Sequence, residues 1–293
     1  MSLPWVSLAA YAAAMVTVVF GARGNVGRHV VEGLISRGEQ VRSTSREPAT
    51  AGFPPGAEVV AADLEQPETL PAALEGAQRV FLYAKPEGID GFVAAAEAAG
   101  VQHVVFLSSG AVLHSNASSN PIALMHSVIE SAIEKSGLNW TFIRPGMFAT
   151  NALWWWQHSI RDEGAVRLPY PEARTAPIHE KDLAALAVTA LTEPGHRGQA
   201  YTVWGAESLT LREQVRQIGA AIDREIAFEV ISDEQARVEL GKTMPEIGVE
   251  AVLAGWKAGV TEPPQVSTIV EDLTGRPAHT FAQWAQDHAL DFR

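Results

Sequence analysis

The sequence of 293 residues contains no cysteine. This absence excludes disulfide bonds, a thiol nucleophile and zinc sites that use cysteine ligands. The nine histidines show no His-Glu-x-x-His or comparable ligand spacing, so we expect no bound metal. A chain without cysteine fits a cytoplasmic protein, and this is the location that we predict.

Basic residues are scarce as well. Lysine and arginine together number 22 against 34 aspartates and glutamates, which gives a formal net charge of −12. Since no basic cluster interrupts this acidic balance, we expect neither nucleic acid nor an anionic membrane as a partner. Hydrophobic residues make up 47% of the chain, which excludes a disordered protein and supplies a buried core. The expected partner is a small molecule, and a homodimer stays open.

The first 22 residues carry no charged side chain. A signal peptide would need basic residues before its apolar run, and these are missing. Met15 directly precedes an apolar strand pattern, so we interpret residues 1–14 as an N-terminal extension. No other stretch reaches the roughly 20 apolar residues of a membrane span.

Short apolar runs alternate with alanine-rich stretches in the N-terminal half. The predicted strands are Val16–Phe20, Gln40–Thr44, Glu58–Ala61, Arg79–Tyr83, His103–Leu107 and Trp140–Ile143, and the predicted helices are 25–37, 67–75, 88–99 and 121–136. Nearly continuous apolar strands that alternate with helices indicate a parallel sheet covered on both faces. The sequence therefore predicts an α/β fold with a doubly wound, Rossmann-type sheet.

After Pro145 this rhythm loosens. The pattern predicts a tryptophan-rich segment at 151–160, a loop at 164–177, helices at 179–192, 210–222 and 278–290, and strands at 199–203 and 226–230. In the last helix, Phe281, Trp284 and His288 share one face. We expect residues 15–150 to form the nucleotide-binding region and residues 151–293 a smaller α+β substrate lobe, with about 177–204 returning to the first region.

A glycine-rich segment follows the first predicted strand and opens a helix. It reads Gly21-Ala22-Arg23-Gly24-Asn25-Val26-Gly27. Glycines let a backbone approach a pyrophosphate, and a helix N-terminus offers free N–H groups and positive potential. This context predicts a dinucleotide-binding loop.

The end of the second predicted strand bears on the choice of cofactor. Sites that prefer NAD(H) usually have an acidic residue there, which binds the ribose hydroxyls. This chain has Ser45 and Arg46 instead, and Arg23 lies in the glycine loop. Two arginines and a serine suit a 2′-phosphate, so we predict NADP(H) rather than NAD(H).

Several motifs in order make the chain similar to the NmrA-like branch of the atypical short-chain dehydrogenases/reductases. They are the GxxGxxG loop, Ala62-Asp63-Leu64, the segment 104–109, Glu130 with the segment 136–141, Arg144–Phe148, Asn151 and Asp182-Leu183-Ala184. The resemblance runs from about residue 16 to 292. It implies an NAD(P)-binding Rossmann fold and does not name a substrate.

The resemblance also implies cofactor contacts along the chain. Asp63 would lie beside the adenine, and Leu82, Tyr83, Ala84 and Lys85 along the middle of the cofactor. Ser108 and Ser109 would lie near the nicotinamide, with Pro145, Gly146 and Phe148 beneath its carboxamide. The alternatives are local: Asp63 as a helix cap, Tyr83 as a packing residue, Lys85 as a solvated side chain and Ser109 as a turn residue.

The chain departs from the family where typical members carry Tyr-x-x-x-Lys. Counted back from Glu130, the lysine position is His126 and the tyrosine position is Ile122. Isoleucine transfers no proton, so the usual alcohol dehydrogenase mechanism is not expected. His126, as an imidazolium, and Ser109 are the candidate catalytic residues, and the alternative for His126 is a hydrogen bond to backbone or cofactor.

Consecutive indoles at Trp154, Trp155 and Trp156 point about 100° apart on a helix. They cannot share one core face, so at least one should line a cavity or be exposed. With Tyr170 and His179 as further substrate candidates, they predict a pocket for an aromatic or conjugated molecule. The alternative is packing between lobes or subunits.

These features leave two functions open. The first is an NADPH-dependent reductase that passes hydride to an electron-poor acceptor such as a quinone or enone, without the Tyr/Lys pair. The second is a non-catalytic NADP(H)-binding sensor that acts through a partner protein.

Overall fold

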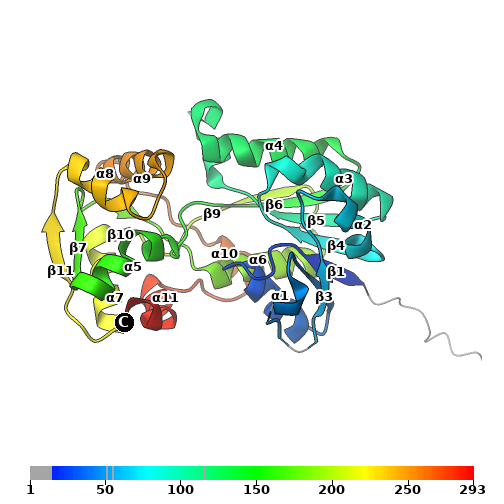
Figure 1. The fold of residues 1–293 in the computed structure, drawn as a ribbon, viewed down its shortest axis with the longest axis horizontal. Coiled ribbons are helices and arrows are strands. Elements are labelled where there is room, and N and C mark those ends of the chain that lie inside the picture. The colour runs from blue at the N-terminus through cyan, green and yellow to red at the C-terminus, as the bar shows by residue number, and fades with distance from the viewer. Residues whose placement is uncertain (1–14, 51, 55, 115–116) are drawn as a thin grey trace, which may run out of the picture. The chain divides into compact units, whose positions relative to one another are not determined.

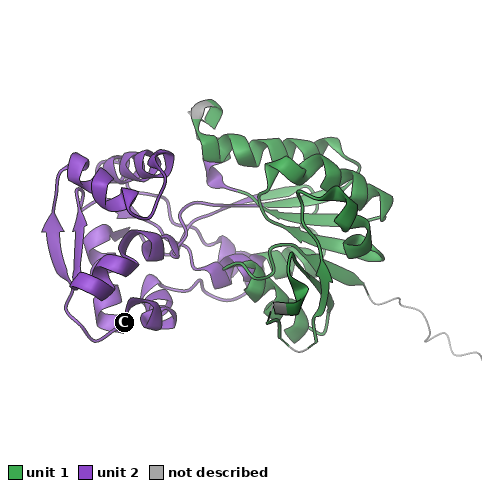
Figure 2. Ribbon diagram, viewed as in Figure 1, with its two compact units in different colours: residues 1–108, 112–142, 187–200 green, residues 109–111, 143–186, 201–293 purple. Residues whose placement is uncertain are grey.

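The computed structural model describes residues 15–50, 52–54, 56–114 and 117–293. The predicted extension at 1–14 lies outside this part of the chain. Two compact units are distinguished in Figure 2. Unit 1 comprises residues 1–108, 112–142 and 187–200, and unit 2 comprises residues 109–111, 143–186 and 201–293. The domain boundary expected at residue 150 stays a prediction.

A seven-stranded sheet runs in the order β3-β2-β1-β4-β5-β6-β9. Its strands are β1 (Val16–Val19), β2 (Gln40–Ser45), β3 (Glu58–Ala61), β4 (Ala77–Leu82), β5 (His103–Leu107), β6 (Asn139–Pro145) and β9 (Gln199–Val203). The pairs from β3 to β5 are all parallel, with Val18 opposite both Arg42 and Val80. Because β2 and β4 flank β1, the chain reverses its direction of winding at β1, as a doubly wound sheet requires. This confirms the predicted fold class.

Helices cover both faces of the strands in unit 1 (Figure 1). They are α1 (Gly27–Ser36), α2 (Leu70–Leu74), α3 (Ile89–Ala98) and α4 (Pro121–Lys135), with the C-terminal part of α6 (Glu180–Thr192) and short 3₁₀ turns between them. The helices α2, α3 and α4 share an apolar core with the sheet, and Phe92, Phe106 and Phe142 are fully buried there. Burial of each phenylalanine contributes about 1.5–3 kcal/mol.

On the other face, α1 lies against α6. A Cβ on Gly33 would come within 2.9 Å of Val188 Cγ2, so the small residue permits this close approach. Arg37 at the end of α1 donates to the Thr192 hydroxyl and pairs with Glu193, both over 2.7–2.8 Å. These contacts fix the last turn of α6 within unit 1.

Unit 2 combines helices with two small sheets. Its helices are α5 (Asn151–Glu163), α7 (Leu211–Ala221), α8 (Asp233–Gly241), α9 (Glu246–Gly259), α10 (Ile269–Thr274) and α11 (Phe281–Asp287), and the chain ends in a 3₁₀ turn, η6 (Ala289–Phe292). The strands β7 (Ala165–Leu168) and β11 (Ala227–Val230) pair in parallel, and β8 (Arg174–Thr175) and β10 (Leu209–Thr210) pair antiparallel. The loop predicted at 164–177 is therefore wrong in part, because two of its stretches pair with strands far along the chain.

The second apolar core fills unit 2. Trp156, Trp256 and Trp284 are almost completely buried in it. The predicted common face of the last helix is confirmed: Trp284 stacks on Phe281 at 5.0 Å and on His288 at 4.7 Å between ring centroids. No helix in the described part of the chain is long and apolar enough to cross a membrane.

Candidate functional site

The predicted dinucleotide loop joins β1 to α1 with a tight backbone turn. Gly21 has φ +68°, and the Gly24 N–H donates to the Gly21 carbonyl over 2.8 Å. A Cβ on Gly27 would lie 2.1 Å from the same carbonyl oxygen. The first turn of α1 has no side-chain cap and no acidic residue. Its free N–H groups and the lack of side-chain bulk fit a pyrophosphate.

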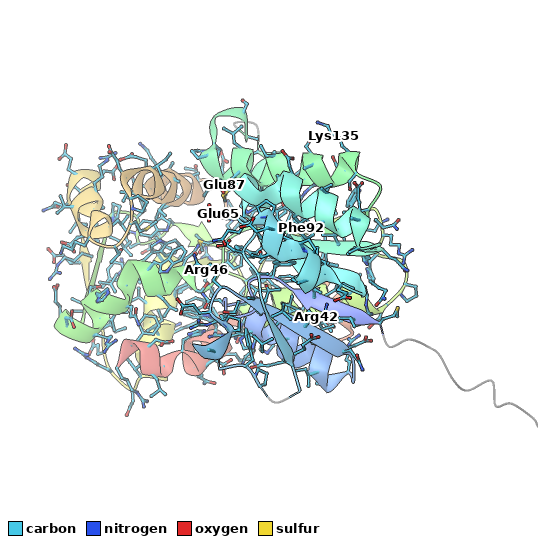
Figure 3. All side chains as sticks on the ribbon, turned by 45° about the vertical axis from the view of Figure 1, so that its right-hand side comes forward. Arg42, Arg46, Glu65, Glu87, Phe92 and Lys135 are labelled. Atoms are coloured by element: carbon cyan, nitrogen blue, oxygen red, sulfur yellow. The ribbon has the colours of Figure 1, made fainter. Side chains whose placement is uncertain are left out.

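The end of β2 is polar: neither Ser45 nor Arg46 is acidic, and the first acidic side chain after the strand is Glu47. Ser45 is 8% exposed and accepts from the Glu47 N–H over 3.1 Å, which leaves its hydroxyl hydrogen to donate. Arg23 and Arg46 are exposed, and neither forms an ion pair with another residue that the structure describes. Figure 3 shows Arg46 on the same side of unit 1 as Glu65 and Glu87, away from Arg42 and Lys135. This arrangement can accept a phosphate.

Two further strand ends carry the residues expected along the cofactor. Asp63 Oδ1 accepts from the Glu65 N–H over 3.1 Å, which makes a turn rather than the helix cap considered above. Lys85 Nζ lies 3.1 Å from Glu65 and 3.7 Å from Glu87. The hydrogen bond with Glu65 raises the pKa of Lys85, so its amine stays charged.

Leu82 is buried in the core, and Ala84 packs against it. Tyr83 is 38% exposed, and its ring lies over Gly21, where a Cβ would come within 2.7 Å of Cδ1. Tyr83 therefore covers the glycine loop, in accord with a place near the cofactor's middle. Its burial raises the pKa of the phenol, so it remains a neutral hydroxyl.

At the end of β5, Ser108 is buried and donates to Glu130 Oε1 over 2.5 Å. Glu130 lies one turn after His126 on α4. The His126 ring packs at 6.1 Å from Phe106 between centroids. These contacts bring Ser108, His126 and Glu130 together inside unit 1; the sequence analysis used Glu130 only as a motif residue and did not predict a site role for it.

The protonation of His126 follows from its surroundings. Nδ1 lies 2.7 Å from the Ile122 carbonyl oxygen, which only accepts, so Nδ1 carries the hydrogen. Burial lowers the pKa of His126, although that carbonyl and the charge of Glu130 counteract it. The ring is therefore neutral at pH 7, and Nε2 is an acceptor. The catalytic role predicted for His126 stays a prediction.

Unit 2 holds the residues expected beneath the nicotinamide. The Gly146 N–H donates to Val203, and a Cβ on Gly146 would collide with the Trp204 ring at 2.2 Å. Phe148 forms a parallel bridge with Ile178, fixed by Ile178 N to Met147 O and by Ala149 N to Ile178 O. Pro145 is buried at the end of β6. The result is a rigid backbone segment from 145 to 149.

Ser109 also belongs to unit 2. Its Oγ accepts from the Ala111 N–H over 3.2 Å, which is the turn chemistry considered above. The hydroxyl hydrogen stays available to a ligand. Its predicted catalytic role is compatible with this bond and stays a prediction.

The three tryptophans of α5 have different surroundings, as their spacing predicts. Trp154 is 61% exposed, Trp156 is 2% exposed, and Trp155 packs against Trp256 at 5.2 Å between centroids. Tyr170 also packs on the unit 2 core, and its hydroxyl donates to Asp233 over 2.7 Å. Packing within unit 2 thus accounts for Trp155, Trp156 and Tyr170, and the predicted substrate contacts of Trp154, Trp155 and Tyr170 stay predictions.

His179 is 1% exposed and lies in a buried ionic cluster. Its Nε2 lies 3.2 Å from Asp287 Oδ2, and its Nδ1 lies 3.2 Å from Glu180 Oε2. Glu180 Oε1 in turn meets His288 Nε2 over 2.7 Å. The sequence missed Glu180 and His288 because 108 residues separate them, and its substrate assignment for His179 stays a prediction. No group of metal ligands occurs among the described residues.

Comparisons with known proteins show the family of this chain. A family model described as NAD(P)H-binding matches residues 21–194. The chain is 38% identical over 281 residues to a (4-alkanoyl-5-oxo-2,5-dihydrofuran-3-yl)methyl phosphate reductase of Streptomyces griseus, which covers 94% of this chain and 98% of that one. It is 35% identical to an NAD(P)H azoreductase of Xenophilus azovorans, with the same shares covered.

A solved structure supports the fold. The NADPH-dependent quinone oxidoreductase of Escherichia coli superimposes with a TM-score of 0.75 at 23% identity, over 92% of this chain and 98% of that one. The glycine loop, the parallel sheet and the family match lead to one assignment. This chain belongs to the NAD(P)H-binding family, as an NmrA-like member of the atypical short-chain dehydrogenases/reductases.

Proposed function

We propose that this protein is an NADPH-dependent reductase that passes hydride to a small conjugated acceptor, such as a quinone, an unsaturated lactone or an azo compound. The observation that carries the proposal is the glycine cradle before an uncapped helix α1, with Arg23 in the loop and Arg46 after β2, neither of which forms an ion pair with another described residue. The two similar reductases reported above act, by their names, on a dihydrofuranone phosphate and on azo compounds.

The preference for NADP(H) rests on charge. Arg23, Arg46 and the Ser45 hydroxyl supply donors for a 2′-phosphate, and guanidinium groups bind phosphate in a bidentate manner. The ring of Tyr83 and the charged Lys85 lie along the path expected for the pyrophosphate and ribose. The chain's own residues thus bind and orient the cofactor, which supplies hydride when it is bound.

The choice of acceptor rests on what the chain lacks. Ile122 stands where a tyrosine would protonate an alkoxide, and neutral His126 offers an acceptor at Nε2. Conjugated acceptors take hydride without prior protonation, since the negative charge spreads over the conjugated system. The overall reaction consumes NADPH, the acceptor and one proton from water, and yields NADP⁺ and the reduced acceptor.

The proposal is tested by mixing the protein with NADPH and a panel of quinones, unsaturated lactones and azo dyes while following cofactor absorbance. Simple ketones serve as controls, and we expect turnover of conjugated acceptors only. Tight NADPH binding without turnover of any acceptor would contradict the proposal and favour the sensor.

A further inference from the structure

A histidine near the C-terminus lies between two carboxylates within unit 2. His288 Nε2 is 2.7 Å from Glu180 Oε1, and His288 Nδ1 is 2.7 Å from Asp291 Oδ2. Carboxylate oxygens accept only, and a neutral imidazole has one N–H. Burial raises the pKa of Glu180, but its hydrogen bonds lower it overall, so Glu180 is ionised and can only accept. With both carboxylates ionised, both contacts form together when both ring nitrogens carry a hydrogen. The geometry is therefore that of an imidazolium.

The surroundings of His288 reinforce this state. Its ring stacks on Trp284, and Glu180 is 1% exposed. From α5, the Gln157 amide donates to the Asp291 carbonyl, which fixes η6. Beyond Glu180, the cluster continues to His179, and Asp287 pairs with both His179 and Lys181. Burial alone lowers the pKa of His288, but the hydrogen bonds to Glu180 and Asp291 outweigh it and raise the pKa above its usual value.

Glu180, which pairs with His288, lies close in the chain to a residue that is hydrogen-bonded to the segment 145–149. Two residues before it, Ile178 accepts from the Ala149 N–H over 2.9 Å and donates to the Met147 carbonyl over 2.8 Å. The Lys181 N–H donates to His179 Nδ1, so the chain from 178 to 181 is held at every step. Backbone hydrogen bonds therefore join the residue two positions before Glu180 to Met147 and Ala149.

We propose that His288 and Glu180 are positioning residues, whose ionic hydrogen bond holds segment 178–181 and thereby the Met147–Ala149 backbone in the conformation that receives the nicotinamide. The inference rests on the proposed function, which assigns this backbone to the nicotinamide end of the cofactor. At alkaline pH, His288 loses a proton and one of its two carboxylate bonds. The segment then loosens, and the nicotinamide end binds less tightly.

The test compares two ligands across the neutral to alkaline range by calorimetry. NADP⁺ contains the nicotinamide, whereas adenosine 2′,5′-bisphosphate contacts only the adenosine end. We expect the affinity for NADP⁺ to fall about three- to tenfold as His288 deprotonates, on the scale of one charge-assisted hydrogen bond, while the affinity for the bisphosphate shows no such step.

Variants of His288 and Asp291 distinguish a positioning role of His288 from a role in protein stability alone. Asp291→Asn removes one of the two carboxylates, so it should move the NADP⁺ step to lower pH by about one unit. His288→Gln should abolish the step, and the exposed His158→Gln should leave it unchanged. A step that persists in His288→Gln, fails to move in Asp291→Asn or is shared by the bisphosphate overturns the inference.

A second measurement needs no ligand. The amide resonances of Ile178 and Ala149 should titrate with the same midpoint as the His288 ring in nuclear magnetic resonance, and that midpoint should shift in Asp291→Asn. Independent titration of these amides would also overturn the inference. Absence of binding by either ligand at any pH would instead reject the proposed function, and the amide titration would still decide the role of His288.

Discussion

The Ser108 hydroxyl donates to Glu130 Oε1 over 2.5 Å, and both side chains are buried. This bond joins the end of β5 to α4, one turn after His126. Hydrogen bonds to charged groups contribute about 1.5–3 kcal/mol, because a buried carboxylate that loses one donor stays desolvated. The pair therefore stabilises the strand end that the proposed function assigns to the nicotinamide side of the cofactor.

Replacing Ser108 by alanine should lower the free energy of unfolding by about 1.5–3 kcal/mol. The matched control is Ser109→Ala, whose hydroxyl makes only the turn bond to Ala111 and should cost less than about 1 kcal/mol. Urea unfolding measures both values. Equal losses of unfolding free energy in the two variants would show that the Ser108–Glu130 hydrogen bond contributes no more to stability than the turn bond of Ser109.

Much of unit 1 could be predicted from the sequence, because its strands are short apolar runs that alternate regularly with helices, and this alternation indicates a parallel sheet even where paired strands such as β1 and β4 lie about 60 residues apart. The runs Glu58–Ala61 and His103–Leu107 match β3 and β5 in full. The glycine loop could also be predicted from the sequence, since a tight turn between a strand and a helix requires glycine at particular positions. In these parts of unit 1, the secondary structure follows from the residue pattern of the same short segment.

Unit 2 was less predictable because its short strands do not alternate regularly with helices. The strand β7 pairs with β11, about 60 residues away, and two residues of β8 pair with β10. No local periodicity marks such pairs. The same holds for Glu180 and His288, whose ionic bond depends on how the last helix packs rather than on any motif.

His103 predicts how stability responds to acid. It is 5% exposed and bonded to the Thr141 hydroxyl, and burial, with nearby positive charge, lowers its pKa from 6.5 to about 4. The folded state thus disfavours protonation. Stability from neutral His103 is present above pH 6.5 and is lost as the pH falls towards about 4, by up to about 3 kcal/mol.

The variant His103→Gln should remove that part of the acid dependence. Thermal unfolding of both proteins between neutral and acidic pH measures it. The difference between wild type and variant should shrink as the pH falls, and a constant difference at every pH would contradict the prediction. His158→Gln provides a control, since His158 is exposed.

Two glycines of the dinucleotide loop should differ in their tolerance of a methyl group. A Cβ on Gly27 would lie 2.1 Å from the Gly21 carbonyl oxygen, whereas one on Gly24 would lie 3.1 Å from it. Gly27→Ala must displace backbone, so we expect NADPH affinity to fall at least about tenfold, the equivalent of some 1.4 kcal/mol. Gly24→Ala should lower NADPH affinity less, because the Gly21 carbonyl oxygen needs to move by only a few tenths of an ångström. Calorimetric titration with NADPH compares the affinities of the two variants. A greater loss in Gly24→Ala than in Gly27→Ala would mean that the cofactor binds elsewhere.

The last prediction concerns the 2′-phosphate. Arg46 is exposed at the end of β2, close enough to Tyr83 for its charge to affect that phenol. If Arg46 binds the phosphate, Arg46→Ala should weaken NADPH by about 10- to 100-fold, the range of one or two charge-assisted bonds, and leave NADH nearly unchanged. The control Arg216→Ala removes an exposed arginine from unit 2 and should alter neither affinity. Calorimetric titration of both cofactors gives the four ratios. Equal losses for NADPH and NADH in Arg46→Ala would mean that the arginine acts on the shared part of the cofactor, and the assignment of NADP(H) would then rest on Arg23 alone.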